Sequence, residues 1–193
     1  TSVGGDLTLR SGAAAGITDS ATVTVGGNLT ATTDANSGVI DMGTLAVTGT
    51  ITLTTDGTGA ATIDNGTANI DIAAASVGGN LTLTSGAAAG ITDSGTVTVG
   101  GNLAATTNAN SGVIDLGSLE VDGTMALVTH GNGAATVVND AVINFAASTV
   151  GGALSATATA GDIIDTGVLT ITGASTFTVA NGANITLGSD NTF

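Results

Sequence analysis

The sequence predicts an all-β protein, a right-handed parallel β-helix (β-solenoid) with about 22 residues per coil and three-coil blocks of about 74 residues. Three observations predict this fold: a composition that favours strands, apolar residues in alternation, and two nested repeats. The 193 residues include 31 Gly and no Pro, Cys, Trp or Tyr. Thr and Val favour strands, and so much Gly argues against long helices.

The longer repeat appears when Ser2–Thr48 is placed beside Ser76–Asp122, which matches it at most positions. It divides the chain into blocks 2–75 and 76–148 and a partial block 149–193, which together form a single solenoid segment over residues 1–193. A shorter repeat within each block begins at a V-x-G entry. The entry positions are Val3, Val25, Val47, Val77, Val99, Val121, Val150 and a diverged Ile171. Each block therefore holds three coils, and the third coil carries extra residues.

One coil shows the expected order of elements. After the entry at Val77, the sequence predicts a strand over Asn80–Thr84 ("NLTLT"), an apolar pair before an acid at Gly90–Asp93 ("GITD"), and a second strand over Thr96–Val99 ("TVTV"). Alternation places aliphatic side chains on one face and hydroxyls on the other. Because one unit cannot bury its own apolar face, it must stack on copies of itself.

Paired glycines begin most coils, and we interpret them as structural turns where the backbone needs unusual dihedral angles or close approach. A glycine-rich phosphate cradle would need a following helix and usually a lysine, which the sequence lacks. The paired glycines are Gly4, Gly5, Gly26, Gly27, Gly78, Gly79, Gly100, Gly101, Gly151 and Gly152.

Aspartates recur at nearly the same offset from each coil entry, so stacking predicts a ladder of carboxylates. The first interpretation is an Asx turn, in which the side chain accepts a hydrogen bond from the backbone two residues on. The alternative is a calcium site between adjacent coils, since hard cations require several oxygen ligands. The candidate calcium ligands are Asp19, Asp41, Asp64, Asp93, Asp115 and Asp165.

Threonine rows are the other periodic polar feature, beginning at Thr22, Thr30, Thr50 and Thr96. Outward threonine is common on a solvated strand face. A flat face of T-x-T hydroxyls is also similar to the arrays of ice-binding solenoids, so direct binding of ice or a glycan is an alternative function.

Charge excludes other classes of partner. Fifteen acidic residues and one basic residue, Arg10, give a formal net charge of −14, which repels nucleic acid and anionic lipid. The chain lacks an apolar run long enough for a spanning helix, so we expect no membrane insertion. We also expect no enzymatic activity and no required cofactor, because a periodic column of aspartates creates no unique pair of carboxylates. His130 stands in a Gly-rich stretch and is interpreted as a solvated turn residue.

The pattern G-G-x-L-x-L, I-x-D-x-G and V-x-V-G-G, as in "GGNLTLTSGAAAGITDSGTVTVGGNL" from Gly78 to Leu103, covers nearly the whole chain. It resembles the repeat shaft of filamentous haemagglutinin-like proteins, the giant bacterial adhesins of two-partner secretion systems. The resemblance implies a secreted or cell-surface shaft, with a host-cell or glycan ligand at a separate tip.

The expected function is therefore a non-enzymatic structural shaft segment of a large extracellular bacterial adhesin or surface fibre. Its expected partners are neighbouring coils of the same chain, or other copies stacked end to end, because exposed end strands pair readily. The second case would make the chain a self-assembling filament subunit.

Overall fold

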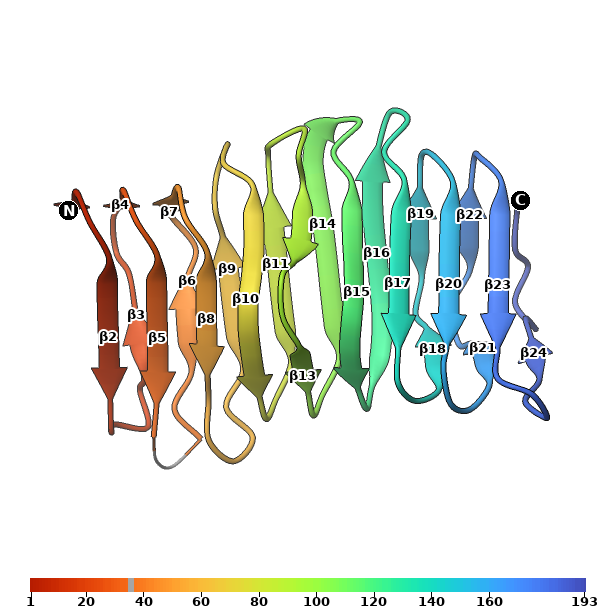
Figure 1. The fold of residues 1–193 in the computed structure, drawn as a ribbon, viewed down its shortest axis with the longest axis horizontal. Helices are drawn as coiled ribbons and strands as arrows, with labels where there is room; N and C mark the ends of the chain where they lie inside the picture. Colours follow the sequence, from red (N-terminus) through yellow and green to blue (C-terminus); the bar gives the residue numbers. More distant parts are fainter. Residues whose placement is uncertain (35–36) are drawn as a thin grey trace.

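The computed structural model describes residues 1–34 and 37–193, and these residues form strands and no helix. The chain is a parallel β-solenoid of about eight turns, about 22 residues apart, which confirms the predicted fold. In Figure 1 the coils follow one another along the long axis, so the two termini lie at opposite ends. The near strands run downward and the fainter strands behind them upward as the chain advances from left to right, which is a right-handed coil.

Three sheets run along the solenoid, and all strand pairs in them are parallel. The three-stranded sheet contains β1 (Ser2–Val3), β4 (Val23–Val25) and β7 (Leu45–Val47). The ten-stranded sheet contains β2 (Leu7–Ser11), β5 (Leu29–Thr33), β8 (Ile51–Thr54), β10 (Ile70–Val77), β12 (Ile91–Asp93), β13 (Val97–Val99), β15 (Ile114–Val121), β17 (Ala135–Asn139), β20 (Leu154–Ala158) and β23 (Ser175–Val179). The eleven-stranded sheet contains β3 (Ile17–Thr18), β6 (Ile40–Met42), β9 (Ala61–Asp64), β11 (Leu81–Ser85), β14 (Leu103–Asn110), β16 (Thr124–His130), β18 (Ile143–Phe145), β19 (Ser148–Val150), β21 (Ile163–Asp165), β22 (Leu169–Ile171) and β24 (Ile185–Thr186).

The core is a column of mainly Ala, Val, Ile and Leu side chains inside the coils, and it also includes Met42, Met125 and Phe145. Along β11 the side chains alternate between buried and half-buried, and Leu81 and Leu83 are both fully buried. Aliphatic residues stack on one another from coil to coil, as Leu81 does on Leu103. The alternation in the sequence thus places one apolar row inside and one hydroxyl row outside.

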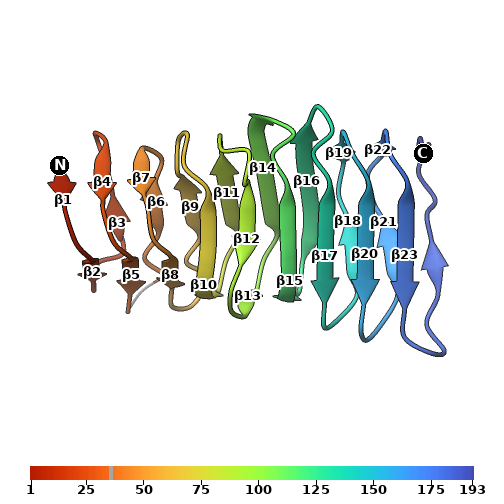
Figure 2. The same cartoon turned by 45° about the horizontal axis from the view of Figure 1, so that its top comes forward.

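The long strand that opens each block changes sheets from one block to the next. Leu7 and Leu81 hold the same position in the sequence repeat, yet β2 lies in the ten-stranded sheet and β11 in the eleven-stranded sheet. The cause is β10, built from the extra residues of the third coil, which returns the chain to the side of β8. The next long strand therefore pairs with β9 on the opposite sheet. The exchange occurs again at β20, and Figure 2 shows that the rod continues across both junctions.

Close stacking of the coils leaves no room for side chains at their corners. A Cβ added to Gly78 would overlap the backbone carbonyl of Gly57 in the preceding coil. The described residues with left-handed φ include Gly16 and Gly90, which lie in other turns and not among the paired glycines. The paired glycines after the first coil are thus needed for close approach of the backbone and not for a special dihedral angle.

Candidate functional site

Asp41 and Asp115, two aspartates of the predicted column, point outward from strands β6 and β15. Asp41 is exposed and lies between Thr18 and Thr62 in the neighbouring strands. Asp115 lies between two threonines in the same way. These carboxylates therefore alternate with hydroxyls from coil to coil and do not face another carboxylate.

Asp19, Asp93 and Asp165 instead bond to the next coil. The two carboxylate oxygens of Asp93 accept hydrogen bonds from the backbone N–H groups of Gly117 at 2.8 Å and Ser118 at 2.7 Å. Asp19 and Asp165 accept equivalent pairs of backbone N–H groups. A carboxylate that accepts two backbone hydrogen bonds makes a strong, charge-assisted link. Each of these side chains thus joins one coil to the following one.

The pKa of Asp165 reflects this arrangement. Partial desolvation acts to raise the pKa, but hydrogen bonds from the Asn191 side chain and from the backbone of Gly188 and Ser189 act against it. The net effect lowers the pKa of Asp165 below the usual value of an aspartate. The site therefore favours the charged carboxylate.

Asp64 makes the Asx turn that the sequence suggested, since its Oδ1 accepts the N–H of Gly66 at 2.9 Å. The six aspartates do not form one ladder, because the sheet exchange places Asp93 and Asp115 on the opposite sheet from Asp41. Within residues 1–34 and 37–193, no three His, Cys, Asp or Glu side chains lie close enough together to hold a metal ion.

Asparagines after the paired glycines form a second set of links that sequence reasoning missed. Asn80 Oδ1 accepts the N–H of Asn102 at 2.9 Å, and Asn102 Oδ1 accepts the N–H of Thr124 at 2.8 Å. Two similar runs occur elsewhere, and they are Asp6–Asn28–Thr50 and Asp162–Asn184. The signal was present in the sequence as the Asn or Asp that follows several V-G-G entries.

Two buried asparagines, Asn65 and Asn139, use their side-chain amides to bond backbone groups of neighbouring strands. Asn139 is fully buried; its Oδ1 accepts the N–H of Val121 at 2.8 Å, and its Nδ2 donates to the carbonyls of Val121 at 3.2 Å and Val142 at 2.9 Å. Asn65 binds both backbone groups of Val47 in the same way. The three-stranded sheet ends at β7, so the Asn65 amide takes the place of a peptide group in a further strand.

The outward threonines form short rows. Thr8, Thr30 and Thr52 stack across three coils, and Ala74 follows them in the next. On the other sheet, Thr82 is followed by an alanine in each of the next two coils. The flat hydroxyl face that ice binding would use is thus limited to a few coils here.

His130 and Arg10 each form a local contact. Nδ1 of His130 lies 2.8 Å from the carbonyl oxygen of Thr107 in the preceding coil. Arg10 forms an ion pair of 2.7 Å with Asp34, and its side chain is 71% exposed.

No helix in the described part of the chain is long and apolar enough to cross a bilayer.

The segments of the chain that match a protein family repeat with the blocks of the solenoid. The model of a family described as repeats of unknown function (DUF5649) matches residues 58–118 and 131–193, more than half of the chain. The chain belongs to the DUF5649 repeat family. Each matched DUF5649 segment begins in the third coil of one block and continues into the next block. No curated protein and no solved structure matches the chain.

Proposed function

We propose that this DUF5649 segment is a non-enzymatic structural rod that gives length and stiffness to a large extracellular bacterial adhesin or surface fibre. The observation that carries the proposal is the unbroken pairing from β2 to β23, which passes through both block junctions. At a spacing of about 4.8 Å per coil, the eight turns extend about 40 Å along the axis.

The polar side chains support a mechanical role. The carboxylates of Asp19, Asp93 and Asp165 and the amides of Asn80 and Asn102 bond along the axis to the following coil. These bonds add to the backbone ladders between coils and resist their separation. A rod needs such axial links, whereas a binding face would leave its polar groups free for a ligand.

The location and partners follow from the resemblance to haemagglutinin-like shafts. The protein is secreted or displayed at the cell surface, and recognition of a host cell or a glycan belongs to a tip outside the rod. Calcium and other cofactors have no part in the proposal. The net charge of −14 keeps the exposed rods apart from one another and from anionic surfaces.

Immuno-electron microscopy of intact producing cells tests the proposal. Antibodies raised against residues 1–193 should label material that extends from the cell surface, without permeabilisation. The control is an antibody against a cytoplasmic protein, which should label permeabilised cells only. Labelling by the solenoid antibody that also requires permeabilisation would contradict the proposal.

A further inference from the structure

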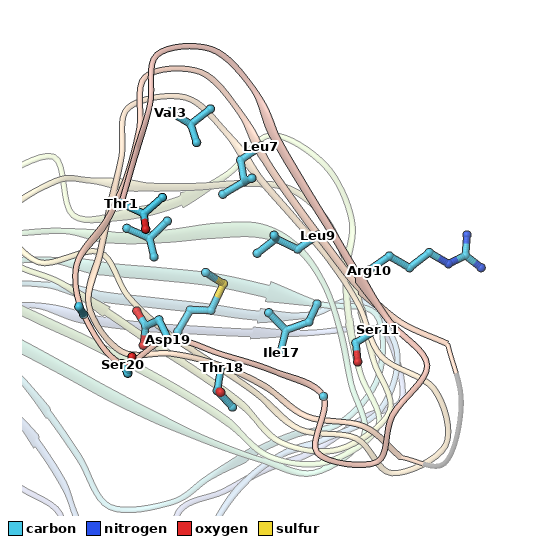
Figure 3. Close-up of a pocket in the computed structure, with 14 residues that line it drawn as sticks. Thr1, Val3, Leu7, Leu9, Arg10, Ser11, Ile17, Thr18, Asp19 and Ser20 are labelled. Atoms are coloured by element: carbon cyan, nitrogen blue, oxygen red, sulfur yellow. The ribbon is translucent and has the colours of Figure 1, made fainter.

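The first coil leaves a hollow, lined by both apolar and polar side chains, open at the N-terminal end of the solenoid. The hollow measures about 640 Å³, and Figure 3 shows Val3, Leu7, Leu9 and Ile17 pointing into it while Arg10 points away. These four apolar side chains are only partly buried. Their equivalents one block later are at most 1% exposed, and they are Val77, Leu81, Leu83 and Ile91. The same residue types are thus fully covered wherever another coil precedes them.

Two positions in this coil, Gly4 and Gly5, have no need of glycine within the 193 residues. A Cβ added to Gly4 or Gly5 would meet nothing within 4 Å. Neither residue is among those with a left-handed φ. At Gly78 and Gly79, in contrast, a Cβ would overlap the backbone of the preceding coil. Glycine at positions 4 and 5 is therefore required only when another coil lies against this end.

The chain itself shows which coil fits. Val3–Ile17 and Val77–Ile91 differ only by Asp for Asn at position 6 and Arg for Thr at position 10. Val77–Ile91 packs on the coil Thr54–Ala75, which ends the first block: Leu81 pairs with Ala61, and the N–H of Gly79 donates to the carbonyl of Gly59 at 2.9 Å. The third block begins in the same way, since the N–H of Gly152 donates to Gly133 at 2.8 Å.

Arg10 adds charge complementarity. Its equivalent, Thr84, lies beside Asp64 of the block-ending coil. A coil of that kind on the N-terminal end would place its aspartate beside Arg10, the only Lys or Arg residue in the chain. The ion pair of Arg10 with Asp34 uses Nε and one terminal nitrogen, which leaves the other terminal nitrogen for the incoming carboxylate.

We propose that Val3–Ile17 is a docking face for a block-ending coil, of the type formed by Thr54–Ala75, supplied by a further repeat of the same polypeptide. This inference rests on the proposed rod function, because it extends the rod by the junction already present at Ser76. It identifies the partner as a coil with an "ATID" strand and excludes a coil from the middle of a block.

An extended chain tests the docking face. A copy of Thr54–Ala74 is placed directly before Thr1, in the register found before Ala75. Backbone N–H groups alternate sides along a parallel strand, and the N–H of Leu7 points to the next coil. The N–H groups of Thr8 and Arg10 therefore point toward the N-terminal end, where they report docking. Hydrogen exchange at Thr8 and Arg10 should slow, and the Tm should rise by several degrees. An extension of equal length copied from 172–192, a coil inside a block, is the matched control and should give neither effect.

The substitution Gly4→Val provides a second test of the docking face. The substitution should leave the Tm of the 193-residue chain nearly unchanged, because its Cβ meets nothing there. In the extended chain it should abolish the gain in Tm. Equal effects in both chains, unprotected Thr8 and Arg10, or equal protection by the 172–192 extension would overturn the inference.

Sedimentation of the unextended chain over a concentration series tests whether a second copy of the chain occupies the docking face instead. We expect a monomer; self-association that Gly4→Val abolishes would assign the face to a second copy and overturn the proposal. Any of these failures would leave the rod function standing if antibodies still label fibres on intact cells.

Discussion

Replacing Asn139 by leucine should destabilise the solenoid strongly although the two side chains have the same number and branching of heavy atoms. The substitution removes the partners of the buried N–H and C=O of Val121 and one partner of the Val142 carbonyl. An unsatisfied buried backbone group costs about 1–3 kcal/mol, so the two groups of Val121 predict a loss of about 2–6 kcal/mol. That is a large part of the roughly 5–15 kcal/mol that stabilises an ordinary domain.

Equilibrium unfolding in urea measures this loss, with the slope checked because repeat arrays can unfold in more than one step. Asn65→Leu should cost a similar amount at the equivalent position of the first block. Asn132→Ala, at an exposed residue, is the matched control and should lie within about 0.5 kcal/mol of the unsubstituted chain. A cost below about 1 kcal/mol for Asn139→Leu would refute the view that the Asn139 amide takes the place of a peptide group beside Val121.

Three further predictions concern the aspartates. Asp93→Ala should cost about 1–3 kcal/mol in urea unfolding because the N–H groups of Gly117 and Ser118 lose their acceptor. Asp115→Ala, which removes no such bond, should change stability by about 0.5 kcal/mol or less. Equal costs for the two substitutions would contradict the axial links. The lowered folded-state pKa of Asp165 stabilises the chain at pH values above the usual aspartate pKa, and this contribution is lost as pH falls through the folded-state pKa. Melting curves should therefore show less acid destabilisation in Asp165→Asn than in the unsubstituted chain. Unchanged acid sensitivity in Asp165→Asn would count against this linkage. Millimolar calcium should leave the Tm unchanged, and a rise in Tm would revive a metal site at the carboxylates.

Coil length, strand positions and the identity of the core residues were accessible from the sequence because they depend on local periodicity. The alternation in Asn80–Thr84 predicts which side chains face inward, and the structure buries Leu81 and Leu83 as that pattern requires. The recurring entry valines predict the length of a coil. Both signals need only the two-residue period of a strand and the requirement that each coil cover the next.

The exchange of sheets at each block junction was not predictable from the same signals. It depends on β10, where the extra residues of the third coil form a strand beside β8 and not a loop. Sequence repeats report which residues are equivalent, but not how far the chain has turned about the axis when they recur. The single carboxylate ladder expected for Asp41 and Asp93 fails for this reason.

The direction of polar side chains was the other missing information. Asp19, Asp64 and Asp93 share nearly the same offset in the sequence, yet Asp64 closes its own turn while the other two bond to the next coil. The choice depends on whether the next coil presents free backbone N–H groups within reach. Such pairing is a tertiary property that spacing alone does not encode.

Continuity through the block junction is the central claim, and a disulfide tests it directly in a chain that lacks cysteine. Thr62 and Thr82 are partners across the junction and both side chains point outward, at a strand spacing of about 4.8 Å that suits a disulfide. The account predicts that Thr62→Cys/Thr82→Cys forms an intramolecular disulfide on oxidation and gains Tm. Thr52→Cys/Thr82→Cys, whose sites lie on different sheets, should remain reduced. Failure of the first pair to cross-link, or equal cross-linking of the second, would contradict a rod that continues from block to block.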